Sequence, residues 1–222
     1  MTAHRPPSFV RSHETGACAG ASALKGRRIA VVGNSGSGKT TLAAVLSRDL
    51  AIPHVELDAL NWGPGWTSLS AQEPETWARR VAEAVSGEGW ITDGNYSERA
   101  LPEILPRATD VIWLDYPRHV IMVRVLRRSF QRALSPTELW PGTGNREDFR
   151  RWLQKDHPIR WAWDTHHSGN DKREGWFEGS AFAELRRHRF RTPAQTRRWA
   201  RGAARAGGDE AARSSGGIWT DA

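Results

Sequence analysis

The sequence predicts an α/β protein in which helices cover both faces of a parallel β-sheet. Short apolar runs alternate with amphipathic stretches, and these strand–loop–helix units recur roughly every 25–30 residues. Parallel strands need crossover connections of this kind. Four of the apolar runs end in a glycine or an aspartate, namely Gly33, Asp58, Asp93 and Asp115. Because the carboxyl ends of parallel strands share one edge of the sheet, we expect a ligand site at that edge.

The first unit contains a nine-residue loop, residues 33–41, that fits the pattern G-x-x-x-x-G-K-[ST]. It follows the apolar run 29–32 and precedes residues 40–50, whose apolar side chains have helical spacing. In this pattern the glycines let main-chain N–H groups surround phosphate oxygens at a helix N-terminus. The lysine reaches the β- and γ-phosphates, and the threonine after it can ligate Mg²⁺. The predicted nucleotide-binding residues are Gly33, Asn34, Ser35, Gly36, Ser37, Gly38, Lys39, Thr40 and Thr41.

The second predicted strand, residues 54–57, ends at Asp58. A carboxylate at this place could orient or deprotonate an acceptor hydroxyl, or it could cap the following loop. That loop is rich in glycine and tryptophan. Trp62 and Trp66 could stack on a planar acceptor or pack against the helix predicted over residues 74–86.

Two aspartates are candidates for the carboxylate that holds a metal ion. Asp93 follows the short strand 90–92, and Asp115 follows the more apolar strand 111–114. Phosphoryl transfer needs a carboxylate that holds Mg²⁺ directly or through water. Composition does not choose between the two, and either could instead stabilise a turn at a strand end.

A basic helix is predicted over residues 118–134. Arg124, Arg128 and Arg132 are spaced four residues apart and share one face, with Arg127 beside them. No acidic residue within the helix neutralises them. We expect a lid that closes over the nucleotide, with Arg124 and Arg128 as catalytic residues that stabilise transition-state charge. The alternative is a solvated basic face with three apolar side chains turned inward: Val123, Leu126 and Phe130.

The C-terminal part predicts a helix around residues 147–155, a last strand over 183–190, and a helix that ends near residue 201. Thr192 and Pro193 fit the N-cap and first position of that last helix. The intervening segment 156–167 contains three histidines. Adjacent histidines seldom chelate one ion, so we interpret the segment as an aromatic packing element and not as a zinc site.

A chain of 222 residues suits one domain with tails. We expect a disordered leader (1–24), a domain (25–202) with its lid at about 118–165, and a disordered tail (203–222).

The basic charge of the chain belongs to its two ends. The net charge is +7 for the whole chain but −3 for residues 29–185. Basic ends of this kind are more often simply solvated than used to bind a specific partner. The sequence therefore does not favour specific nucleic-acid binding. The single cysteine, Cys18, excludes disulfides, and no apolar run approaches the ~20 residues that span a bilayer. We expect a cytoplasmic protein with a small-molecule partner and no membrane partner; the sequence does not reveal the oligomeric state.

Four segments together resemble a known group of proteins. They are GNSGSGKTTLA, VELDALNWGPGW, ITDGNY and VIWLDYP. The chain resembles the adenylate-kinase-related P-loop kinases, and among them the FlaR-like proteins that carry the label DNA topology modulation protein. The resemblance covers roughly residues 28–201 and excludes both ends.

The resemblance implies a P-loop NTPase fold with strand order 2-3-1-4-5, a small helical lid after the fourth strand, and ATP–Mg²⁺ as phosphoryl donor. It also favours Asp93 over Asp115 as the residue that faces the metal, because the related kinases carry a D-G motif there. Those kinases continue with an arginine that grips an acceptor phosphate. Here the motif continues with Asn95 and Tyr96, and Arg99 is the nearest arginine.

The leading hypothesis is an ATP-dependent kinase that transfers the γ-phosphoryl group of ATP–Mg²⁺ to a small, nucleotide-like acceptor. Thr40 and Asp93 are expected to hold Mg²⁺. The expected catalytic residues are Lys39, Asp58, Arg124 and Arg128. The alternatives are a nucleotide-dependent ATPase or switch that acts through a partner, and a DNA-topology-related regulator that uses the basic ends.

Overall fold

The computed structural model describes residues 24, 26–94, 100–179 and 184–203. The predicted leader and tail therefore lie outside the described residues, apart from Leu24 and Ala203. Asn95, Tyr96 and Arg99 also lie outside them. In the described part of the chain, no helix combines the length and the apolar character needed to cross a membrane.

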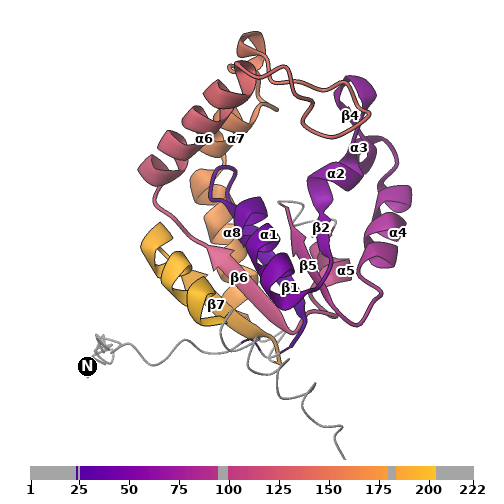
Figure 1. Cartoon of the computed structure of the whole chain (residues 1–222), viewed down its shortest axis with the longest axis vertical. Helices are drawn as coiled ribbons and strands as arrows, with labels where there is room; N and C mark the ends of the chain where they lie inside the picture. The colour runs from indigo at the N-terminus through magenta and orange to yellow at the C-terminus, as the bar shows by residue number, and fades with distance from the viewer. Residues whose placement is uncertain (1–23, 25, 95–99, 180–183, 204–222) are drawn as a thin grey trace, which may run out of the picture.

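A five-stranded parallel sheet forms the centre of the molecule (Figure 1). Its strands are β1 (Arg28–Gly33), β2 (His54–Glu56), β5 (Trp90–Asp93), β6 (Asp110–Leu114) and β7 (Arg186–Phe190). Their spatial order is β2-β5-β1-β6-β7, and every neighbouring pair is parallel. Numbered among these five strands alone, the order is 2-3-1-4-5. The predicted α/β fold with this strand order is confirmed.

Alternate residues of the central strands point to opposite faces of the sheet, and each face has its own apolar core. Ile29 and Val31 of β1 join one core, whereas Ala30 and Val32 join the other. The first core is closed by α1 (Lys39–Leu50), α6 (Arg118–Ala133), α7 (Pro158–Asp164) and the helix at residues 193–203. The second is closed by α4 (Pro74–Ala84), α5 (Leu101–Ile104) and α8 (His166–Glu178). Helices therefore cover both faces, as predicted.

Local sequence signals place several of these helices where they were expected. In α4, Trp77 and Val81 are one turn apart and fully buried, and Pro74 occupies the first turn. The last helix begins after Thr192, whose Oγ1 accepts a hydrogen bond from the Gln195 main-chain N–H at 3.3 Å. The Gln195 side chain in return accepts from the Thr192 N–H at 3.1 Å, which completes a capping box.

The prediction of a helix around residues 147–155 is wrong. The structure has only the short 3₁₀ turn η2 (Phe149–Arg151) there, and the next helix starts later, at Pro158. His157 caps that helix by accepting the Ile159 main-chain N–H on its side chain. The proline fixes a helix start at this point, and the preceding residues lack an inward apolar stripe.

Two irregular parts of the chain meet on the carboxyl side of the sheet. After β2 the chain forms α2 (Leu57–Asn61), the two-residue strands β3 (Trp62–Gly63) and β4 (Thr67–Ser68) with the 3₁₀ turn η1 (Pro64–Trp66) between them, and α3 (Leu69–Gln72). After α6, residues 134–148 contain neither strand nor α-helix and run across to the β3–β4 hairpin (Figure 1). We call residues 134–148 the strap.

Candidate functional site

The glycine-rich loop connects the end of β1 to the start of α1, as the sequence predicts. Gly36 and Gly38 have positive φ values of 84° and 95°, a conformation that glycine adopts without strain. A Cβ atom at Gly36 would also lie 2.9 Å from Cβ of Val125 in α6. The conformation of the loop therefore suits only glycine at these two positions, and α6 packs directly against the loop.

Lys39 lies at the first turn of α1 with only 9% of its surface exposed. Its Nζ donates a hydrogen bond to the Asn34 carbonyl oxygen at 3.1 Å. Burial lowers the pKa of Lys39 to about 8; the carboxylates of Asp93 and Asp58 oppose this shift, and Arg173 and Arg128 reinforce it. A buried ammonium group whose neighbours include two guanidinium groups favours an anionic ligand.

Those two arginines are themselves withdrawn from solvent. Burial lowers the pKa of Arg128 to about 10, and burial likewise lowers the pKa of Arg173 to about 10. Arg128 Nε and Ser37 Oγ of the loop are both buried, with no hydrogen-bond partner in the described part of the chain. These orphaned donors beside the loop fit phosphate oxygens, which would satisfy them.

Thr40 and Asp93 meet at the carboxyl edge of the sheet. The Thr40 hydroxyl donates to Asp93 Oδ2 at 2.5 Å, and His54 Nε2 lies 2.7 Å from Asp93 Oδ1. A hydroxyl and a carboxylate are oxygen ligands of the kind that Mg²⁺ prefers. In the residues that the structure describes, no three His, Cys, Asp or Glu side chains form a metal cluster. The donor set therefore fits Mg²⁺ that is completed by water and phosphate oxygens, which is its usual coordination.

Asp115, the other candidate for the metal, has different partners. Its Oδ1 accepts from Asn170 Nδ2 at 3.0 Å, and its Oδ2 accepts from Arg189 Nε at 2.9 Å. Arg189 also pairs with Glu174 of α8 at 2.9 Å. Asp115 therefore ties β6 to β7 and α8, whereas Asp93 contacts the phosphate loop.

The arginine face of α6 is turned toward the phosphate loop. Arg128 Nη2 lies 3.4 Å from Ser35 Oγ, and a Cβ atom at Gly38 would lie 2.9 Å from Arg124 Nη2. Arg127 and Arg132 are exposed. The alternative interpretation, in which three apolar side chains turn inward, is wrong. Those side chains, Val123, Leu126 and Phe130, are 67%, 42% and 52% exposed. The inward positions belong to Ile121, Val125 and Ser129.

Asp58 lies in α2, just beyond the end of β2, and completes the group around Lys39. Its carboxylate opposes the lowered pKa of both Lys39 and Arg128, so it lies near both cations. Glu56 lies beside it, and burial raises the pKa of Glu56, with Asp93 and Asp58 adding to the shift. Two more carboxylates therefore lie at the end of β2 and the start of α2, and one of them, Asp58, lies near Lys39 of the phosphate loop.

Trp62 and Trp66 do not pack against α4, which was one of the two places expected for them; stacking on an acceptor stays a prediction. They do not belong to the apolar core that α4 closes. Their rings are 5.9 Å apart and both contact Trp140 of the strap, at centroid distances of 6.3 and 6.0 Å. Each of the two is only half-buried.

Three side chains of this site were missed by the sequence analysis. Arg173 of α8 lies near Lys39, and Trp140 and Asn145 of the strap contact residues 56–66. Arg173 sits between Lys172 and Glu174 in a helix without a strong apolar pattern. No local signal distinguishes it from the charges around it.

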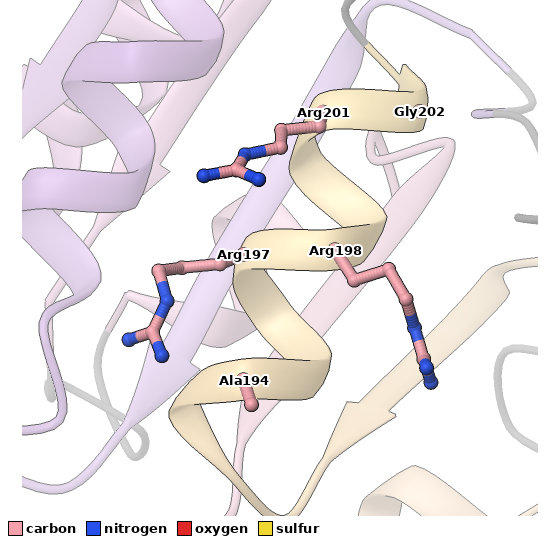
Figure 2. A pocket seen from close by; sticks show the side chains of 5 residues that line it. All are labelled: Ala194, Arg197, Arg198, Arg201 and Gly202. Atoms are coloured by element: carbon pink, nitrogen blue, oxygen red, sulfur yellow. The ribbon is translucent and has the colours of Figure 1, made fainter.

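A separate surface hollow lies on the last helix, away from these residues. It is lined by Ala194, Arg197, Arg198, Arg201 and Gly202. Figure 2 shows Arg197 and Arg201 on one side of the helix and Arg198 on the other. These lining residues supply positive charge but include no carboxylate, hydroxyl or histidine, so the hollow lacks a group that could hold a metal or orient a nucleophile.

No protein-family profile matches the sequence, and no curated protein does. Solved structures do match. A shikimate kinase from Acinetobacter baumannii in complex with shikimate is 18% identical with a TM-score of 0.50, and the match covers 80% of this chain and 90% of that chain. A gluconokinase from Sinorhizobium meliloti 1021 is 16% identical with a TM-score of 0.45 and covers 87% and 99%. A putative kinase from Chloroflexus aurantiacus is 19% identical with a TM-score of 0.46 and covers 79% and 95%. Of these three, the match to the shikimate kinase reaches a TM-score of 0.50, and it shows the P-loop NTPase fold alone.

Proposed function

We propose that the protein is an ATP-dependent kinase that transfers the γ-phosphoryl group of ATP–Mg²⁺ to a hydroxyl of a small molecule. One observation carries the proposal: buried Lys39 lies near two cations, Arg128 and Arg173, and near two carboxylates, Asp93 and Asp58. Phosphoryl transfer requires this combination of positive charge, a metal-holding carboxylate and a group that faces the nucleophile. The proposal rests on the site, because one fold serves many functions.

On the donor side, the loop residues 33–41 surround the phosphates with main-chain N–H groups, and Lys39 binds the β- and γ-phosphates. Thr40 and Asp93 would hold Mg²⁺, and the bound ion would neutralise charge on the phosphate oxygens. Arg124 and Arg128 reach the loop from α6, and Arg173 reaches it from α8. Their guanidinium groups stabilise the charge that spreads over the transferred group.

On the acceptor side, Asp58 orients the acceptor hydroxyl and takes its proton as the new P–O bond forms. The bond between the γ-phosphorus and the bridging oxygen breaks in the same displacement, and ADP leaves with that electron pair. Asp58 suits this role because its carboxylate lies near both Lys39 and Arg128 without being a residue of the phosphate loop. A nucleotide-like acceptor and a FlaR-like kinase remain predictions within this proposal.

The test is to incubate the protein with γ-labelled ATP–Mg²⁺ and a panel of nucleotides, nucleosides and small alcohols. Transfer of the label to one compound establishes a kinase. Release of free phosphate alone, equal with and without every compound, would instead establish an ATPase or switch. The matched control is Lys155→Ala, because Lys155 is an exposed lysine outside the site. Normal nucleotide binding by Lys39→Ala would overturn the site assignment.

A further inference from the structure

The side chain of Asn145 in the strap makes two hydrogen bonds to the β3–β4 hairpin. Its Nδ2 donates to the Gly63 carbonyl oxygen at 2.9 Å, and its Oδ1 accepts from the Trp66 main-chain N–H at 3.0 Å. Asn145 is only 2% exposed, and its own carbonyl oxygen accepts from the Leu139 N–H at 2.8 Å. The amide group therefore pairs with both kinds of main-chain group, as a neighbouring strand would.

Trp66 has a backbone conformation that depends on its surroundings. Its φ is 63°, in the left-handed region that residues with a Cβ atom rarely adopt. Several groups that hold it there come from the strap and the turn after it. Besides Asn145, Trp140 contacts its ring at 6.0 Å, and the Arg151 guanidinium carbon lies 4.2 Å from the ring centroid. A strained conformation of this kind persists when surrounding contacts over-determine it.

The strap also reaches the carboxylates at the end of β2 and the start of α2. Trp140 Nε1 donates to Glu56 Oε1 at 3.3 Å, and the Trp140 ring stacks on Trp62 at a centroid distance of 6.3 Å. Glu56 lies at the end of β2, beside Asp58. The position of the strap therefore bears directly on the acceptor side of the site.

The other end of the strap continues from α6. Arg128 of α6 contacts Ser35 of the phosphate loop, and Arg124 lies beside Gly38. Ile121 and Val125 anchor the first half of the helix in the apolar core, whereas its inward position nearest the strap is the polar Ser129. One continuous segment therefore touches the donor phosphates' loop at one end and the hairpin at the other.

We propose that Asn145 and Trp140 are positioning residues for the acceptor: they fasten the strap to the hairpin and so form the outer wall of the acceptor side. When donor phosphates bind Arg124 and Arg128, they hold α6 and the strap in the position that this structure shows. Donor binding therefore strengthens the contacts of Asn145 and Trp140 with Trp66. The coupling is reciprocal, because a closed strap also favours the arginine positions that bind phosphate. The inference rests on the proposed function, since it requires ATP in the loop.

The test measures hydrogen exchange of the Trp66 amide by NMR, with and without a non-hydrolysable ATP analogue and Mg²⁺. We expect the analogue to slow exchange of this amide at least fivefold in the unmodified protein. In Asn145→Ala the amide should exchange at least tenfold faster, and the analogue should change its rate less than twofold. Asn145→Asp keeps an oxygen for the Trp66 N–H but sets a second carboxylate oxygen against the Gly63 carbonyl oxygen, so it should lose part of the protection.

If the contacts between the strap and the hairpin were purely structural, they would protect the Trp66 amide equally with and without the analogue. An unchanged hydrogen-exchange rate in the unmodified protein therefore overturns the inference. Binding of the analogue is measured separately, by displacement of a fluorescent nucleotide. If the analogue binds and the rate is unchanged, the inference fails while nucleotide binding stands; if the analogue does not bind, both fail. In Arg128→Ala, a saturating concentration of the analogue should slow exchange of the Trp66 amide less than twofold. The control Arg127→Ala, at an exposed position of the same helix, should respond to the analogue as the unmodified protein does.

Trp140 is tested by Trp140→Phe, which keeps a ring on Trp62 and removes the N–H that Glu56 accepts. Once label transfer has identified an acceptor, this variant should raise the KM for that acceptor at least fivefold and change the KM for ATP less than twofold. Trp161→Phe, at a half-exposed tryptophan of α7, is the control. Equal changes in both KM values would show that Trp140 does not position the acceptor side.

Discussion

The two sides of the candidate site are built in different ways. The phosphate side comes from one continuous loop between a strand and a helix, with Lys39 at the first turn of α1. The acceptor side is assembled from residues 54–66 and the strap, and its main contacts join positions 79 to 84 residues apart. The first side depends on local backbone geometry, and the second depends on whether two distant segments meet. Substitutions on one side should therefore change its function and leave the function of the other side nearly unchanged.

The largest effect is expected for Asp58→Asn. Loss of a general base typically lowers the rate roughly 10²- to 10⁴-fold, and the amide cannot take the hydroxyl proton. Nucleotide affinity should change less than threefold, because Asp58 is not a residue of the phosphate loop. Single-turnover transfer of label and a separate nucleotide titration check both parts. A rate within threefold of the unmodified protein would remove Asp58 from the acceptor side.

A smaller but still large effect is expected for Lys39→Ala. Charge-assisted contacts of a buried lysine to phosphate are worth about 3 kcal/mol, which is roughly a hundredfold in affinity. The loss should appear in the dissociation constant of a fluorescent ATP analogue. The hydrogen bonds between Asn145 and the hairpin should persist in this variant. Asp58→Asn should therefore affect the acceptor side alone, and Lys39→Ala the phosphate side alone.

The two aspartates at strand ends give a paired comparison of moderate size. Asp115→Asn should lower the free energy of unfolding by about 1–3 kcal/mol, because its pair with Arg189 is mostly buried, and it should leave the Mg²⁺ dependence unchanged. Asp93→Asn should raise the Mg²⁺ concentration needed for half-maximal nucleotide binding about tenfold. Denaturant unfolding and Mg²⁺ titrations distinguish them. The reverse pattern would make Asp115 the residue that holds the metal.

The smallest effect at neutral pH is expected from titration of Lys39 itself. Burial lowers its pKa to about 8 in the folded protein from 10.5, so the unfolded chain binds more protons between these values. Stability from this group therefore rises with pH in that window, by up to about 1.4 kcal/mol per pH unit. Phosphate binding needs the charged form, so nucleotide affinity should be halved near pH 8 and fall further above it. The difference between the unmodified protein and Lys39→Met isolates the contribution of this residue.

Much of the sheet and the phosphate side could be predicted because each signal is local. Alternating or helical spacing of apolar residues placed β1, β6, α1 and α4, and the loop pattern placed Lys39 between a strand and a helix. For α6 the spacing defined its two faces correctly. It did not decide which face points inward, since that depends on the phosphate loop that lies beside the helix.

The acceptor side could not be predicted to the same depth. Asn145 and Trp140 lie in a segment with no periodic pattern, and their partners are far away in the sequence. The sequence marks the loop of Trp62 and Trp66 as aromatic, but the ring that both contact is Trp140 of the strap, which no local pattern pairs with them. Arg173 depends likewise on how α8 is placed against the sheet.

The left-handed backbone at Trp66 makes this position a conflict between stability and activity. Glycine there would relieve the backbone and at the same time delete the ring contacts, so the two contributions to the free energy of unfolding have opposite signs and partly cancel. Selection for a heat-resistant protein would therefore tolerate glycine at position 66, which selection for turnover would reject. A library randomised at this one codon, sorted separately for each property, should return two different sets of residues.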